Sequence, residues 1–301
     1  MQTKIFYKGI FYTCLASLFW GIPQPLFFNE LKFIPAIEIA FHRGFWSFFF
    51  LLTIIVFLGK IRDFFEIFLY YRKLFVLSIT AILISINWTG FIMAVNINRV
   101  QDASMGYYLT PLISIGLGYF FLNEKISPLK LLSIIIMSSA IIYLILTLKT
   151  IPFLALLIGI TWGIYGLLRK KINVSPEIGL LYESGFITLI AAPYLIYLHY
   201  YDFGFFLNDS FYTSVLLILT GAVTIFPLFF FNLGVKSIPL SFAGVIFYLT
   251  PTFHFITSIF ILNEPITTHK LISFIMIWIA VIIFIYDIFK KGREINVSNI
   301  Q

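Results

Sequence analysis

Apolar stretches of about 20 residues follow one another along nearly the whole chain, separated by short polar connections. A stretch of that length can cross a lipid bilayer as an α helix. The composition agrees, because 60% of the 301 residues are hydrophobic and 11% are charged, whereas soluble domains carry roughly 25% charged residues. The runs lack the two-residue alternation of a membrane β-barrel. We therefore predict an all-α membrane protein that contacts the lipid bilayer.

We predict ten transmembrane helices, and the charges between them indicate their orientation. Of the 20 Lys and Arg residues, 15 lie in connections on the side of the two termini, 4 lie on the other side, and Arg43 lies within a span. Cytoplasmic connections carry the excess of such residues. We expect both termini in the cytoplasm and the protein in the inner (plasma) membrane of a bacterium. The predicted spans are residues 9–28, 37–58, 74–95, 104–122, 129–147, 151–168, 179–199, 213–233, 241–262 and 271–289.

The two halves of the chain share short motifs at a nearly constant spacing. The motif YLTP begins at Tyr108 and again at Tyr248. At the same spacing the triplet LNE ends at Glu124 and at Glu264, where we expect a structural role at a turn. The dipeptide WG occurs at residues 20–21 and again at 162–163, at a slightly larger spacing. We predict two five-helix repeats, residues 1–148 and 149–301.

A unit with an odd number of spans places its second copy upside down in the membrane. Such inverted repeats are common in secondary transporters, whose substrate site lies near the midplane between the repeats. The sequence therefore favours a transporter, although inverted repeats also occur in channels.

Ionisable residues inside the predicted spans are the first candidates for that site, because they are costly in lipid and usually face the interior. The second span contains Glu38, His42 and Arg43, and the seventh contains Glu183. The repeat spacing makes Glu183 equivalent to His42 or Arg43. We expect Arg43 and Glu183 to face one central cavity and to pair directly or through a substrate.

Other polar residues in the spans carry weaker signals. Asn87 and Trp88 lie in the third span, and amides at such positions more often join helices than bind ligands. His254 in the ninth span is more often a packing residue than a ligand. Phosphate-binding loops and the HExxH, CxxC and GxSxG motifs are absent from the sequence. We expect no enzyme, no cofactor, no metal and no ATP-driven transport by this chain alone.

Several segments together resemble a known family. They are LFWGIPQPLFF, PAIEIAFHRGFWS, NWTGFIMAVN and ASMGYYLTPLISIGLGYFFLNE in the first half, and TWGIYGLLRK, TIFPLFFFNLGVKSIPLS and IFYLTPTFHF in the second. These segments resemble the RarD group of EamA transporters, within the drug/metabolite transporter superfamily. The resemblance implies ten spans, inverted repeats, cytoplasmic termini and alternating access, and the group has been linked to drug export and chloramphenicol sensitivity.

The resemblance also implies that six residues of the second and third spans line the substrate cavity. Glu183 and His254 are added from the analysis of polar residues in the spans. We predict a substrate site formed by Glu38, His42, Arg43, Trp46, Asn87, Trp88, Glu183 and His254.

The resulting prediction is a secondary transporter that moves a small-molecule substrate, a metabolite or a drug, across the inner membrane. A proton is one candidate coupling ion. The net charge of +7 follows from membrane orientation, so we expect no nucleic-acid partner. Two alternatives stay open: an intramembrane enzyme that modifies a lipid, which would need a cluster of His, Asp or Glu near one interface, and a passive channel. Substrate, direction and oligomeric state are not predicted.

Overall fold

The structure is a computed structural model that describes residues 2–96, 100–148, 153–261 and 268–298. Within these ranges the regular secondary structure is helical, as the apolar runs predict. The second LNE triplet includes Glu264 and lies outside the described residues. The elements are α1 (Gln2–Gly21), α2 (Pro23–Asn29), α3 (Ala36–Phe57), α4 (Ile61–Glu66), η1 (Ile67–Leu69), α5 (Tyr71–Asn96), α6 (Val100–Leu122), α7 (Pro128–Leu148), α8 (Phe153–Lys171), α9 (Pro176–Tyr200), α10 (Phe211–Ser237), α11 (Leu240–Phe247), α12 (Leu249–Phe260) and α13 (Thr268–Ser298).

Each predicted span overlaps one helix, or two helices that follow each other directly. In the described part of the chain, seven segments are long and apolar enough to cross a membrane. Two shorter apolar helices, Gly106–Leu122 and Leu271–Asp287, accompany them. The chain is therefore a multi-pass membrane protein, while the count of ten crossings stays a prediction. The seven segments are Lys4–Asn29, Ala36–Phe57, Tyr71–Met93, Pro128–Thr147, Pro176–Tyr200, Phe211–Ser237 and Leu240–Thr257.

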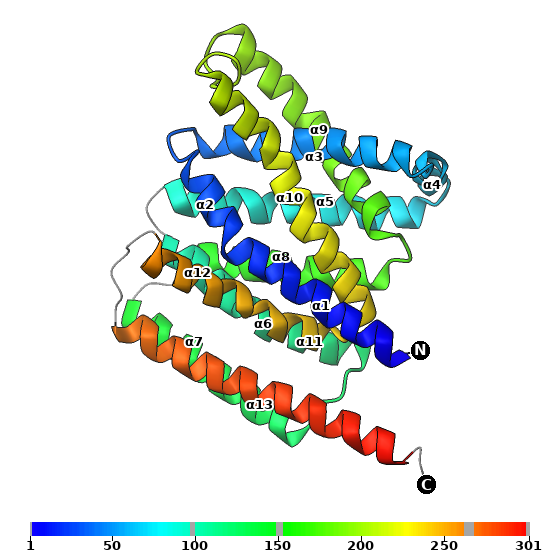
Figure 1. Cartoon of the computed structure of the whole chain (residues 1–301), viewed down its shortest axis with the longest axis vertical. Coiled ribbons are helices and arrows are strands. Elements are labelled where there is room, and N and C mark those ends of the chain that lie inside the picture. Colours follow the sequence, from blue (N-terminus) through cyan, green and yellow to red (C-terminus); the bar gives the residue numbers. More distant parts are fainter. Residues whose placement is uncertain (1, 97–99, 149–152, 262–267, 299–301) are drawn as a thin grey trace.

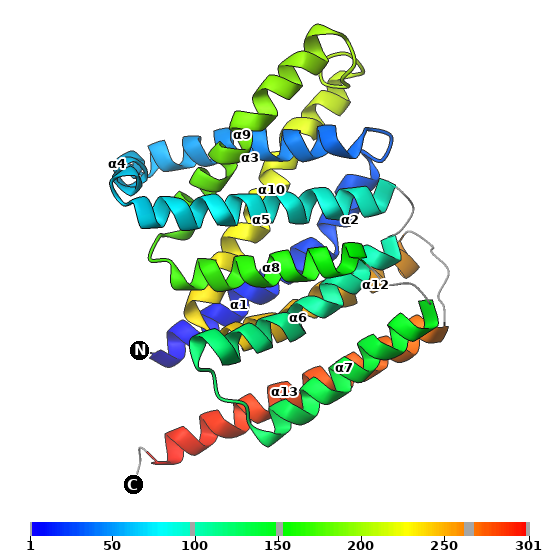
Figure 2. The same ribbon diagram turned by 180° about the vertical axis from the view of Figure 1, so that it is seen from behind.

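Helices from the two halves of the sequence interleave in the bundle. α1 packs against α10, α8 packs against α5, and α3 packs against α9. α7 and α13 run side by side at one edge, and α9 and α10 form the opposite edge (Figure 2). α1 begins and α13 ends at the same end of the bundle (Figure 1). We call this the terminal end.

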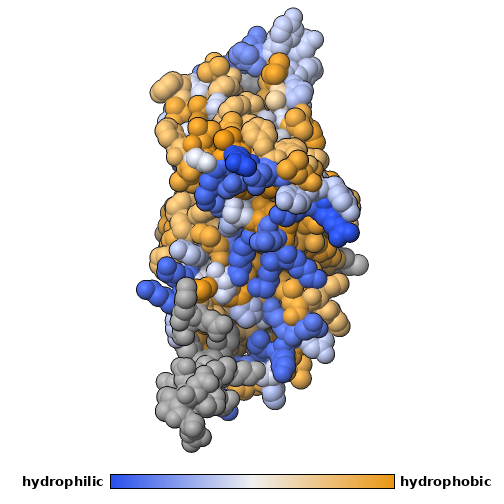
Figure 3. All heavy atoms as spheres, turned by 90° about the vertical axis from the view of Figure 1, so that its right-hand side faces the viewer, coloured by the Kyte–Doolittle hydropathy of each residue, from blue (hydrophilic) through white to orange (hydrophobic). Residues whose placement is uncertain are grey.

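The surface separates into an apolar belt and a polar end. Many large apolar side chains are exposed, among them Phe57, Phe120 and Phe211. Soluble monomers rarely expose so much contiguous apolar surface, so these side chains face lipid. Seen from the terminal end, hydrophilic side chains gather across the face of the bundle (Figure 3). That face therefore lies outside the hydrocarbon core.

Two interruptions of the helices lie next to the interior. α1 ends at Gly21, and α2 restarts with a proline, whose ring lacks the N–H that a continuous helix needs. α11 and α12 meet at Tyr248. The carboxylate of Glu124 accepts hydrogen bonds from the backbone N–H groups of Leu240 and Ser241, at 2.6 and 3.1 Å, and so caps α11. This contact supports the structural role expected for Glu124.

Candidate functional site

A central cavity lies between the two halves of the sequence. It encloses about 400 Å³ of space, part of which is open to the outside. The side chains crowd it, so that it has room for on the order of one or two waters in this conformation. Its walls come from α1, α2, α3, α5 and α6 of the first half and from α8, α10 and α11 of the second. The residues that line it are Trp20, Gln24, Arg43, Asn87, Trp88, Phe91, Tyr107, Trp162, Leu228 and Phe247.

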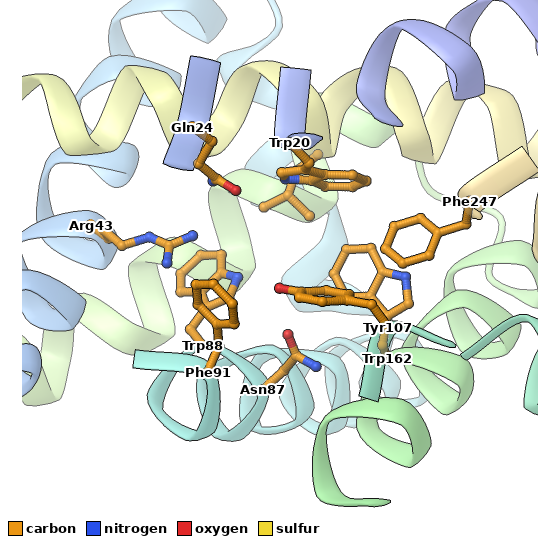
Figure 4. Close-up of a pocket in the computed structure, with 10 residues that line it drawn as sticks. Trp20, Gln24, Arg43, Asn87, Trp88, Phe91, Tyr107, Trp162 and Phe247 are labelled. Carbon is orange, nitrogen blue, oxygen red and sulfur yellow. The ribbon is translucent and has the colours of Figure 1, made fainter. Parts of the chain in front are cut away.

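Arg43 supplies the positive charge of the cavity. The side chain extends from α3 toward the open space (Figure 4), and the residue is 4% exposed. Its Nε donates a hydrogen bond to Thr224 Oγ1 at 3.0 Å. The guanidinium carbon lies 4.7 Å from the ring centroid of Trp88 and 4.9 Å from that of Phe28. These rings stabilise the cation through their π faces.

Aromatic rings form much of the remaining wall. The rings of Trp20 and Trp162 meet edge to face at 5.1 Å, and Phe247 stacks on Trp162 at 5.6 Å. The indole Nε1 of Trp162 is buried and has no hydrogen-bond partner among the described residues. Because a buried indole N–H usually has a partner, this wall offers an unused donor.

Two amides and a phenol complete the polar lining. Asn87 Nδ2 donates to Ile158 O at 2.9 Å and to Thr161 Oγ1 at 3.2 Å, which turns Oδ1 toward the cavity (Figure 4). Gln24 Nε2 is buried and lacks a hydrogen-bond partner in the described part of the chain. The hydroxyl of Tyr107 points into the same space (Figure 4).

His254 lies behind this wall and does not line the cavity. Its Nε2 is 2.8 Å from the backbone oxygen of Trp20, and its ring centroid is 5.7 Å from that of Tyr107. The histidine therefore holds two lining residues in place, which agrees with the packing role that single histidines usually have.

Glu38, His42 and Trp46 form a chain of contacts on another face of α3. Trp46 Nε1 donates to His42 Nδ1 at 3.1 Å, and His42 Nε2 lies 4.0 Å from Glu38 Oε1. Glu38 Oε1 accepts a hydrogen bond from the backbone N–H of Phe205 at 2.7 Å. Phe206 packs against the rings of His42 and Trp46. These predicted site residues fasten the connection between α9 and α10 to α3 and stay outside the cavity lining.

Glu183 lines a second, smaller cavity of about 250 Å³, which shares Trp88 and Leu228 with the first. Its carboxylate accepts hydrogen bonds from Thr80 Oγ1 at 2.6 Å and Tyr165 OH at 3.2 Å. Its ionic partner is Arg169, whose Nε lies 3.7 Å from Oε1.

Arg43 and Glu183 thus form no direct pair in this conformation, and they line two adjoining cavities instead of one; pairing through a substrate stays a prediction. Each of the two side chains uses other partners: Thr224 for Arg43, and Thr80 and Arg169 for Glu183. The reason is that a nearer cation, on the helix that precedes Glu183 in the sequence, already neutralises the carboxylate.

The sequence placed Arg169 among the cytoplasmic connections, but it is buried, with 1% of its surface exposed. Nε donates to Asn232 Oδ1 and Nη2 to Pro176 O, both at 3.2 Å. A Cβ at Gly179 would collide with its guanidinium, so glycine leaves the space that the arginine occupies. The available signal was Glu183 itself, since a carboxylate inside a span needs a cation and Arg169 is in the preceding helix.

Seven lining residues were not predicted as site residues. Trp20 and Trp162 had been noticed only as markers of the repeat, and the remainder are mostly aromatic in a chain with 37 Phe and 17 Tyr residues. In a chain so rich in aromatic residues, the sequence does not distinguish an aromatic side chain that lines the cavity from one that faces lipid. The seven are Trp20, Gln24, Phe91, Tyr107, Trp162, Leu228 and Phe247.

Comparisons with known proteins agree with this architecture. The EamA-like transporter family matches the chain twice, at residues 7–146 and 149–286. The uncharacterized transporter YojE of Bacillus subtilis is 35% identical over 95% of this chain and 96% of its own length. The protein RarD of Escherichia coli is 32% identical over 98% and 99%.

A crystal structure of a protein with 14% sequence identity covers 91% of this chain and 96% of its own, with a TM-score of 0.69. At that identity the match supports the fold alone. The family is one of transporters and not of enzymes. On the two family matches and the full-length relatives, the chain belongs to the EamA-like transporter family, in its RarD group.

Proposed function

We propose that the protein carries a small metabolite or drug across the inner (plasma) membrane of a bacterium by alternating access, with the central cavity as the substrate site. The observation that carries the proposal is the cavity itself, which lies between the two sequence halves and receives a buried guanidinium. Ionisable side chains that face the interior of a membrane protein mark substrate or ion pathways. Alternating access at a site between repeats is the common plan of secondary transporters.

The proposal includes ten spans in two inverted five-helix repeats, residues 1–148 and 149–301, with cytoplasmic termini. Contacts between repeat-equivalent residues support it, because equivalent residues meet at a pseudo-two-fold axis. The rings of Trp20 and Trp162 are 5.1 Å apart. The hydroxyl of Tyr248 donates to the backbone oxygen of Tyr108 at 2.9 Å. The two family matches, one in each half, are a second support.

A second pair of contacts has approximately the same symmetry. Arg43 of the first half donates to Thr224 of the second, and Glu183 of the second half accepts from Thr80 of the first. Arg43 and Glu183 are separated by the same interval as the two YLTP motifs, and Thr224 lies about one helical turn beyond the equivalent of Thr80. The two contacts are therefore approximately related by the repeat: in each, a charged residue of one half is hydrogen-bonded to a threonine of the other half, and the charge is positive in one contact and negative in the other.

The polar cluster around Arg169 and Glu183 separates the central cavity from the terminal end, where α8 ends (Figure 2). In our proposal it is the cytoplasmic gate, closed in this conformation. The ammonium of Lys60 adds a 2.6 Å contact to Glu177 at the start of α9. Because of this hydrogen bond and the carboxylate's charge, the pKa of Lys60 is raised and the contact stays ionic at neutral pH.

A proton is the proposed coupling ion. Glu183 is the carboxylate that lines a cavity in the described structure, and its partner Arg169 would be released if the carboxylate were protonated. Binding of a proton at Glu183 would thus weaken the contacts that keep the gate closed. Proton binding would in this way favour one conformation over the other, as coupled transport requires.

The test begins with a metabolite screen on purified protein by thermal shift, because a ligand that binds the folded state raises its stability. The transport of each hit is then measured in vesicles. Accumulation against a gradient supports the proposal. Equilibration without accumulation would indicate a passive channel, and chemical conversion of a lipid would indicate an intramembrane enzyme; either result would overturn it.

A further inference from the structure

The two deeply buried guanidinium groups differ in their counterions. Arg169 has a carboxylate partner, Glu183, at 3.7 Å. Arg43 is similarly buried but contacts a neutral hydroxyl and two aromatic rings. None of the carboxylates in the described residues forms an ion pair with it. A buried charge is normally paired, so the cavity holds one positive charge that the described residues do not neutralise.

The internal repeat indicates that this difference is built into the sequence. In the second half, Arg169 supplies the counterion for the charge on the seventh predicted span. The WG motifs are the repeat markers nearest to Arg169, and their spacing makes Phe27 its equivalent in the first half. The next residue, Phe28, contacts the Arg43 guanidinium. The first half therefore places aromatic rings where the second half places a charged partner.

The rest of the lining has unused hydrogen-bond donors. Gln24 Nε2 and Trp162 Nε1 are buried without a partner among the described residues. Of the described residues that line the cavity, none is Asp or Glu. A negatively charged ligand would pair with the Arg43 guanidinium and accept a hydrogen bond from Gln24 Nε2, whereas an ammonium group would find one neutral acceptor, Asn87 Oδ1, and no carboxylate among the described lining residues.

The shape and lining of the cavity indicate what the uncharged part of the ligand is. Its faces are the rings of Trp88, Trp162 and Phe247, and it is narrow in this conformation. Aromatic rings stack or meet edge to face with a flat partner, and such contacts add to the burial of apolar area. A flat ring therefore fits between these walls with less rearrangement than a bulky aliphatic group.

We propose that the transported solute is a planar organic anion, an aromatic carboxylate, whose carboxylate pairs with Arg43 and whose ring lies among the cavity aromatics. This proposal rests on the proposed transport function and specifies its substrate class. Arg–carboxylate pairs are the strong, often bidentate type of charge-assisted hydrogen bond. The Nε atom is held by Thr224, so the terminal nitrogens are the ones that face the ligand.

The experiment measures binding of four matched probes to the purified full chain in lipid nanodiscs. Phenylacetate has the ring and the negative charge, phenylacetamide is its neutral analogue, cyclohexylacetate lacks the flat ring, and phenylalanine adds an ammonium group together with one carbon. Tryptophan fluorescence reports on the site directly, because Trp20, Trp88 and Trp162, three of the five tryptophans, line it. We expect phenylacetate to bind at least about tenfold more tightly than each of the other three.

Variants at two arginines identify the charge that is responsible. Arg43→Gln should weaken phenylacetate binding about tenfold or more and leave the affinity for phenylacetamide nearly unchanged. Arg62→Gln is the matched control, because the Arg62 side chain is 87% exposed in α4 and does not line the cavity. A melting curve without ligand establishes that each variant is folded.

Each outcome decides the proposal. Preference for phenylacetate that is lost in Arg43→Gln supports it. Equal or tighter binding of the amide or of phenylalanine overturns the anionic class, and if Trp88→Leu weakens that binding the cavity remains the substrate site. Failure of all four probes at millimolar concentration also overturns this inference. The proposed transport function is then judged separately by the metabolite screen and vesicle assay, which presuppose no substrate class.

Discussion

At the scale of residues, the surroundings of Arg43 and Arg169 support the proposal that Arg43 binds the ligand, whereas Arg169 is engaged by the protein itself. Arg169 is held by Glu183, Asn232 and the backbone of Pro176. A group with so many fixed partners has little freedom to bind anything else. Arg43 has one hydrogen bond and two ring contacts, which orient the guanidinium and leave its outer edge to the cavity.

This contrast predicts opposite effects on stability. Arg169→Gln leaves Glu183 buried without its counterion, a change that costs about 3–5 kcal/mol in buried pairs, so the melting temperature should fall sharply. Arg43→Gln strands no carboxylate and should melt close to the wild type. Thermal unfolding in nanodiscs measures both. The double variant Arg169→Gln with Glu183→Gln should recover much of the loss, and equal destabilisation by the two single arginine variants would contradict the assignment.

Glu183→Gln tests the proposed role of this carboxylate in coupling. The amide cannot bind and release a proton, but its oxygen can still accept the hydrogen bond from Thr80, while its NH2 group donates to the hydroxyl oxygen of Tyr165. Exchange of substrate across the vesicle membrane should therefore persist, while accumulation driven by a proton gradient should be lost. Both are measured in proteoliposomes with a substrate from the metabolite screen. Unimpaired proton-driven accumulation in this variant would remove Glu183 from the coupling mechanism.

At the scale of elements, the helices could be predicted from the sequence because membrane spans follow from local composition. Each predicted span overlaps a helix, and the break after Gly21 lies at a proline. Tyr108 and Tyr248, which the motif spacing makes equivalent, are also in contact. Hydropathy, prolines and motif spacing can be read from the sequence directly. They do not depend on which face each helix turns toward its neighbours.

The partners of the site residues depend on the faces that the helices turn toward each other, and they were predicted less well. Arg43, Asn87 and Trp88 line the central cavity, and their role in binding a substrate stays a prediction. Glu38, His42 and Trp46 share α3 with Arg43 but project elsewhere. The position of Arg169 at the end of its span suggested a solvent-exposed charge, while its packing against Gly179 puts it inside.

The contact between α8 and α9 predicts a strong effect of a single methyl group. In Gly179→Ala the new Cβ collides with the guanidinium of Arg169, which cannot move without leaving Glu183. Overpacking of this kind costs about 1–3 kcal/mol, and disturbance of the ion pair adds to it. Gly116→Ala in α6 is the control, since a Cβ there meets no atom within 4 Å. Its melting temperature should be unchanged or slightly higher, and equal melting of both variants would contradict the packing account.

At the scale of the whole molecule, helices of both halves surround the central cavity, and the polar cluster around Arg169 and Glu183, our proposed gate, lies toward the terminal end. The walls come from helices of both halves, so relative movement of the halves would open and close the cavity. The apolar belt keeps the bundle in the bilayer, and the hydrophilic terminal end is the side that the charge bias assigns to the cytoplasm (Figure 3).

The most direct test of alternating access asks from which side of the membrane the cavity can be reached. Leu228→Cys, made with Cys14→Ser so that it is the single cysteine, places a thiol between the two cavities. A membrane-impermeant thiol reagent is applied to right-side-out and to inside-out vesicles that hold an ion gradient. Leu69→Cys in the same background is the control, because Leu69 is 78% exposed in the predicted cytoplasmic connection between α3 and α5.

Alternating access predicts that the Leu228→Cys protein is labelled in both vesicle orientations while the ion gradient persists, and that the Leu69→Cys protein is labelled only in inside-out vesicles. Labelling of the cavity thiol from both sides with collapse of the gradient would indicate an open channel. Labelling from one side only, or from neither, would contradict alternating access to this cavity.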